Sequence, residues 1–129
     1  MGLDIYIRKG TKTSTTHETD LWDETEEFAY WRKFNALHKW FVENVCEGSD
    51  DCEYWNISKE KLEEFLSILK SLTPENCHKL LPTQSGFFFG STDYGEWYWN
   101  DVNKTIPIIE TILNETNFEN ETLWYTASW

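Results

Sequence analysis

Apolar and polar residues alternate near both ends of the chain, which is the pattern of a half-buried β-strand. In residues 3–8 three aliphatic side chains fall on one face, and residues 123–129 alternate in the same way and predict a closing strand. Residues 9–20 are rich in threonine and charged residues and follow no period, so we expect a mobile loop there.

The middle of the chain instead repeats its apolar residues at intervals of three and four, as helices do. Residues 25–45 carry apolar side chains on two stripes, which predicts a largely buried central helix. Ser58 is placed to cap a second helix with a leucine-rich stripe. Residues 94–115 predict a third helix, which Pro107 should kink or split because proline lacks the backbone N–H that a helix needs.

Short segments complete the pattern. Residues 54–57 predict a short strand, residues 73–75 (Thr-Pro-Glu) the start of a brief helical turn, and Phe87–Phe89 between two glycines a short buried strand. The strands are short and the loops polar, which disfavours a doubly wound parallel sheet. We therefore expect one α+β domain over residues 1–129, with a small, mostly antiparallel sheet of about four strands and three helices packed on one face.

Charge and cysteine content narrow the class of protein. The chain has 11 Lys and Arg against 23 Asp and Glu, a net charge of −12, which argues against direct binding to nucleic acid or to an anionic membrane. No apolar run is long enough for a membrane span, and the start lacks a signal-peptide pattern, so we expect a cytoplasmic protein. Three cysteines, Cys46, Cys52 and Cys77, in a chain without a signal peptide predict free thiols. They form no C-x-x-C pair, so we expect no metal site, and we expect no cofactor.

Aromatic residues are unusually frequent: eight Trp, six Tyr and eight Phe. Most should build the core, but a small domain rarely buries every indole completely. Some rings should therefore line a cleft or an interface, where they could stack on a flat ligand or contact a protein partner.

One cationic and amide cluster stands out within the 25–45 segment. Arg32, Asn35 and Lys39 are spaced three and four apart, so they would share one side of the predicted helix, next to Tyr30 and Trp31. Such a cluster could hold a phosphate while the rings stack a base. The alternative is that both cations pair with the many local carboxylates.

Two further features could be either structural or functional, namely His38 and the segment of residues 91–93. His38 is either a hydrogen-bonded core residue or a functional base. Ser91, Thr92 and Asp93 before the third helix offer either an anion site or an ordinary helix cap. No nucleophile or familiar catalytic motif is visible, so we name no catalytic residue and leave enzymatic activity open.

Several stretches resemble a family of small proteins common in phages and prophages. They are MGLD-x-Y, YWRK-x-N-x-x-H-x-WFV, LPTQ-x-GFFFGST and the closing Ser-Trp. The resemblance implies a phage setting and suggests a shared pocket in which polar motif residues lie among rings. Together with the spacing argument, it makes the candidate ligand-binding residues Tyr30, Trp31, Arg32, Asn35, His38, Lys39, Thr83, Gln84, Ser91, Thr92 and Tyr94.

The function expected from these features is that of a phage accessory, counter-defence protein that binds and sequesters a small nucleotide-like ligand. The alternative is an acidic protein-binding inhibitor or nucleic-acid mimic that blocks a host defence or nucleic-acid enzyme. The last 49 residues favour the mimic, since they carry seven acids and one base. A hydrolase of nucleotide signals that uses His38 ranks below both, and self-association stays open.

Overall fold

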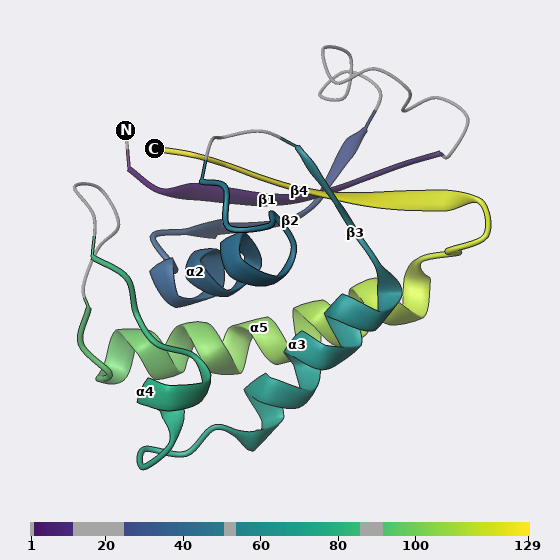
Figure 1. The fold of residues 1–129 in the computed structure, drawn as a ribbon. Helices are drawn as coiled ribbons and strands as arrows, with labels where there is room; N and C mark the ends of the chain where they lie inside the picture. Colours follow the sequence, from purple (N-terminus) through teal and green to yellow (C-terminus); the bar gives the residue numbers. More distant parts are fainter. Residues whose placement is uncertain (1, 12–24, 51–53, 86–91) are drawn as a thin grey trace.

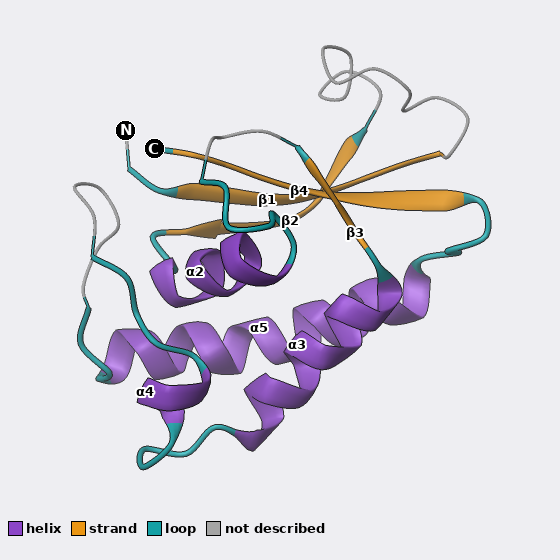
Figure 2. Ribbon diagram, in the orientation of Figure 1, coloured by secondary structure: helices purple, strands orange, loops and turns teal. Residues whose placement is uncertain are grey.

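Four antiparallel strands form one sheet in the computed structural model, which describes residues 2–11, 25–50, 54–85 and 92–129. Their order across the sheet is β2 (Glu26–Arg32), β1 (Asp4–Thr11), β4 (Glu121–Ser128) and β3 (Trp55–Ile57). The described helices are α2 (Asn35–Asn44), α3 (Lys59–Ser71), α4 (Cys77–Leu80) and α5 (Glu96–Glu115). They lie on one side of the sheet, as Figures 1 and 2 show. The expected α+β class is confirmed.

The central strand, β1, has partners on both edges. Ile5 is opposite Trp31 of β2 and Ala127 of β4, and Ile7 is opposite Ala29 and Tyr125. All four of these partners and both isoleucines are buried. The alternation of β1 therefore places one apolar row against the helices.

Stacked rings join the sheet to the helices beneath it. Phe41 of α2 lies parallel to Tyr125, with 4.6 Å between ring centroids, and meets Phe65 of α3 edge-on at 5.1 Å. Trp40 contacts Phe65 at 4.8 Å. These four rings are buried in the core, as the sequence predicts for part of its aromatic residues, and each such ring buries about 150–250 Å².

The helix predicted over residues 25–45 is wrong in its first part. Residues Glu26–Arg32 form β2, and only Asn35–Asn44 are helical. The reason is tertiary: β1 needs hydrogen-bonding partners on its second edge, and residues 26–32 supply them. The alternation of Ala29 and Trp31 facing inward with Tyr30 and Arg32 facing outward serves a strand as well as a helix.

Of the predictions about α3 and α5, one is confirmed and two are wrong. Ser58 caps α3 as predicted, since its Oγ accepts a hydrogen bond from the backbone N–H of Lys61 at 3.2 Å. α5 is one helix that continues through Pro107, with buried residues on both sides of it, so of the predicted kink or split the split is wrong. Its N-cap is Gly95, so the cap predicted at residues 91–93 is also wrong.

The predicted loop over residues 9–20 is shorter at its start than expected. β1 extends to Thr11, so residues 9–11 belong to the sheet and not to the predicted loop. The remainder of that loop and the strand predicted at Phe87–Phe89 lie outside the described residues. Among the described helices, none is long and apolar enough to cross a membrane.

Trp31 and Trp97 provide a matched test of this architecture. Trp31 is fully buried, whereas Trp97 on α5 is 79% exposed. Trp31→Ala is expected to lower the free energy of unfolding by about 3–5 kcal/mol, because it opens a cavity under the sheet. Trp97→Ala should change it by less than about 0.5 kcal/mol. Urea denaturation of both variants measures the difference, and equal effects would contradict the placement of β2.

Candidate functional site

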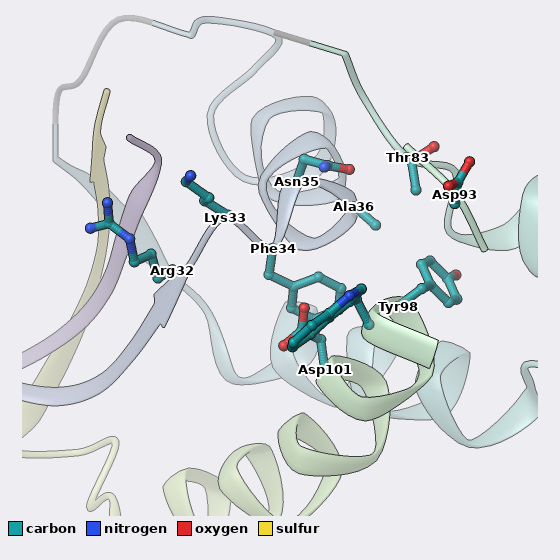
Figure 3. A pocket seen from close by; sticks show the side chains of 10 residues that line it. Arg32, Lys33, Phe34, Asn35, Ala36, Thr83, Asp93, Tyr98 and Asp101 are labelled. Atoms are coloured by element: carbon teal, nitrogen blue, oxygen red, sulfur yellow. The ribbon is translucent and has the colours of Figure 1, made fainter. Parts of the chain in front are cut away.

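A pocket of about 400 Å³ opens where β2 ends and where α2 and α5 begin. Its lining comes from three segments, residues 32–36, residue 83 and residues 93–101 (Figure 3). The described lining residues are Arg32, Lys33, Phe34, Asn35, Ala36, Thr83, Asp93, Trp97, Tyr98 and Asp101.

Lys33 forms the sharp corner between β2 and α2. Its φ is +59°, in the left-handed region that side chains other than glycine rarely adopt. Its N–H donates to the carbonyl of Leu3 at 2.7 Å, and its own carbonyl accepts from the N–H of Asn35 at 3.0 Å. The strained corner turns the chain from strand to helix and puts two cations at the pocket rim.

Gly2 lets the start of the chain pass beneath those cations. Its φ is +124°, and a Cβ at this position would lie 3.0 Å from Nη2 of Arg32 and 3.3 Å from Cε of Lys33. A side chain here would strain the backbone and press on both cations.

The rim of the pocket at this corner is positively charged. Nη1 of Arg32 donates to Oδ1 of Asp4 at 3.1 Å, while about half of the Arg32 side chain stays exposed. Lys33 is exposed, and no described acid pairs with its ammonium group. The first turn of α2 contains no acidic residue, so the positive end of its dipole is not neutralised from within the helix.

Residues 81–84 run between α2 and α5 and are hydrogen-bonded to both regions. The backbone N–H of Gln84 donates to Oδ1 of Asn35 at 3.0 Å. Thr83 donates through its backbone N–H to the Tyr94 hydroxyl at 3.1 Å and through Oγ1 to the carbonyl of Thr92 at 2.9 Å. These bonds hold the side of the pocket opposite the cations.

The α5 side of the pocket combines an exposed ring with carboxylates. Trp97 is 79% exposed, which is unusual for an indole. Asp101 follows it by four residues, so both lie on one face of the helix. Burial raises the pKa of the Asp101 carboxyl, and Lys104 opposes that rise. Figure 3 shows Asp93 beside Thr83, across the pocket from Arg32 and Lys33.

His38 belongs to a separate polar cluster, in which His38 and Tyr125 are buried and Asp50 is exposed. Its Nε2 lies 2.7 Å from Oδ1 of Asp50, and its Nδ1 lies 2.6 Å from the hydroxyl of Tyr125. Burial lowers the pKa of His38 and raises that of Tyr125, so both are neutral at pH 7. Neutral His38 therefore donates from Nε2 to the carboxylate and accepts from the tyrosine, which makes it a core residue joining α2, β4 and Asp50.

The structure brings together some of the predicted site residues. Arg32, Asn35 and Thr83 line the pocket. Gln84, Thr92 and Tyr94 are hydrogen-bonded to that lining, while Ser91 lies outside the described residues.

Four predicted site residues lie elsewhere. Trp31 is fully buried and donates its indole N–H to Oγ1 of Thr105 at 2.9 Å, so it is not open to stacking on a ligand. Tyr30 lies on the other face of the sheet and donates to Asp4. Lys39 pairs with Glu43 at 2.6 Å, outside the pocket, and His38 is in the core. The prediction that Arg32, Asn35 and Lys39 share one side of a helix is wrong, because Arg32 is in β2.

Sequence reasoning did not include Trp97, Tyr98 and Asp101 in the site. The four-residue spacing of Trp97 and Asp101 was a usable signal, since it places a ring and an acid on one helix face. Nothing in the sequence indicated that this face lines the same pocket as Lys33, which depends on how α5 packs under the sheet.

Metal-binding side chains do not cluster in the part of the chain that the structure describes. Among the described residues, no three His, Cys, Asp or Glu side chains cluster so as to hold a metal ion. Cys77 is a buried free thiol, Cys46 is buried, and Cys52 lies outside the described residues.

Comparison with known proteins adds no further constraint. The chain matches no protein-family model, no curated protein and no solved structure. The resemblance to small phage proteins therefore stays a prediction.

The lowered pKa of His38 should make the stability of the fold depend on pH. The pKa of His38 is lower in the folded protein than its ordinary value of 6.5, so the unfolded chain takes up a proton first as the pH falls. The contribution of His38 should be complete above about pH 6.5 and be lost as the pH falls from there through the folded-state pKa. Urea denaturation from pH 7.5 to pH 5 measures this, and His38→Gln should flatten the slope. An equally steep slope in the variant would contradict it.

Proposed function

We propose that the protein binds a small nucleotide-like ligand in the pocket between β2, α2 and α5 and holds it without turning it over. The observation that carries the proposal is the combination of two adjacent cations and an exposed tryptophan around one pocket, in a chain with a net charge of −12. Cations so placed in an acidic protein suit a specific anion better than a polyanion surface.

The size of the pocket favours one nucleotide unit. Small-molecule pockets measure roughly 300–1,000 Å³, and this one, at about 400 Å³, is near the lower end. A mononucleotide or a cyclic mononucleotide suits that volume better than an oligonucleotide does.

The distribution of groups matches the two halves of a nucleotide. Lys33 and Arg32, with the first turn of α2, offer positive charge for a phosphate. Trp97 offers an exposed face for a base, and stacking of one base on an aromatic ring contributes about 1–3 kcal/mol. The described lining contains no histidine or cysteine.

The phage resemblance supplies the setting of the proposal. A phage accessory protein that binds a host nucleotide signal tightly would lower its free concentration and act as a counter-defence protein. Sequestration needs affinity and abundance but no catalytic group.

The alternative function, an acidic inhibitor or nucleic-acid mimic, is favoured by the excess of 23 acids over 11 bases. The two proposals differ in what they bind. A mimic would capture a basic nuclease or polymerase in a salt-sensitive manner, and Lys33→Glu should leave that capture unchanged or strengthen it. A nucleotide-binding protein would lose its ligand on the same change.

Calorimetry with a panel of linear and cyclic mononucleotides tests the proposed function through Arg32. Arg32→Ala should lower affinity about tenfold or more, because hydrogen bonds to a charged group contribute about 1.5–3 kcal/mol. Its stability should change by less than about 1 kcal/mol, because the pair with Asp4 is exposed. Arg32→Lys should restore affinity only in part. Lys39→Ala is the control, since that cation lies outside the pocket. No heat with any nucleotide at high micromolar concentration would overturn the proposal.

At Lys33 the left-handed backbone costs stability, while the ammonium group should contribute to nucleotide binding. Lys33→Gly relieves a left-handed residue and should leave stability unchanged or raise it by up to about 1 kcal/mol. Nucleotide affinity should fall about tenfold, because a charge at the phosphate is lost. Glu47→Gly is the matched control: Glu47 has a φ of +54°, is exposed and lies outside the pocket. It should gain stability with unchanged affinity, and a loss of binding in both variants would contradict the role of Lys33.

A further inference from the structure

The two ends of the pocket differ in charge. Lys33 and Arg32 stand at the rim on one side, Asp93 lies across from them beside Thr83, and Asp101 contributes a second carboxylate from α5, near Phe34 (Figure 3). A ligand in this pocket would place an anion at the cations and hydrogen-bond donors at a carboxylate, since ionised carboxylates only accept.

Asp101 is the acceptor best placed to read a base. Among the described residues, no N–H or O–H group donates a hydrogen bond to its carboxylate, although the side chain is partly buried. The absence of internal donors agrees with the rise in its pKa, which comes from burial. Lys104 opposes this rise and favours the ionised form. The acceptor capacity of Asp101 is thus unused within the described protein.

Trp97 and Asp101 are positioned to act on the same ring system. Residues four apart on a helix are neighbours, with about 5–6 Å between their Cβ atoms. A base stacked on the exposed Trp97 ring would therefore bring one edge toward the Asp101 carboxylate.

The chemistry of the base edges then distinguishes among nucleotides. Guanine presents two adjacent donors, N1–H and the N2 amino group, which one carboxylate can accept together. Adenine and cytosine present a donor next to an acceptor, and uracil a single N–H between two carbonyls, so each turns a lone pair toward the carboxylate. Resting on the function proposed above, we infer that the pocket selects guanine nucleotides, with Asp101 accepting from N1–H and the N2 amino group.

Calorimetry with GMP, IMP, AMP, CMP and UMP at pH 7.5 tests this selection. GMP should bind at least tenfold more tightly than AMP, CMP or UMP, as is typical of a bidentate contact to a base. IMP, which lacks the N2 amino group, should fall between GMP and AMP. In Asp101→Asn the ratio of GMP to AMP affinity should fall below about threefold, because the amide replaces one acceptor oxygen by a donor.

Glu96→Gln is the matched control for Asp101→Asn. It removes the same charge from α5 but lies outside the pocket, so the preference for GMP should persist. Thermal melting without ligand should show both variants folded. Equal affinity of the wild type for all five nucleotides would overturn guanine selection and leave the proposed function standing. Unchanged selectivity in Asp101→Asn would overturn the role of Asp101, and no binding of any linear or cyclic mononucleotide would overturn both proposals.

Discussion

The central strand β1 is hydrogen-bonded along both of its edges, and the rest of the structure depends on that double pairing. Ile5 and Ile7 are fully buried, and each lies opposite buried residues of β2 and β4. A buried strand must satisfy its backbone groups on both sides, so residues 26–32 are drawn into the sheet. The helices lie on one side of the sheet (Figure 2), where the buried residues of its strands give them an apolar face to pack on.

The pocket is a consequence of how β2 ends. The chain passes from the last residue of β2 to the first of α2 through Lys33, whose left-handed backbone reverses direction over a very short distance. The N-terminal ends of α2 and α5 meet at this corner, and residues 81–84 are hydrogen-bonded to both regions. Cations, a ring and carboxylates from distant parts of the sequence therefore surround one cavity.

Two polar groups of the molecule contrast in how they are satisfied. The His38 ring has an internal partner at each nitrogen, Tyr125 and Asp50, and lies in the core. The Asp101 carboxylate has no donor among the described residues and faces the pocket. The first arrangement stabilises the fold, whereas the second leaves an acceptor available to a ligand, which is why burial and hydrogen bonding distinguish structural from binding residues better than residue type does.

The sequence by itself determined the α+β class, strands near both termini and the cap of α3 at Ser58, because alternation and capping depend on neighbours along the chain. Only the tertiary structure decided that residues 26–32 form a strand, since their aromatic pattern suits both periods and the unpaired edge of β1 resolves it. It likewise decided that Trp31 is in the core and that Lys33 and Asp101 line the same pocket. Those relations join residues up to about 70 positions apart, and no local pattern encodes how α5 packs beneath the sheet.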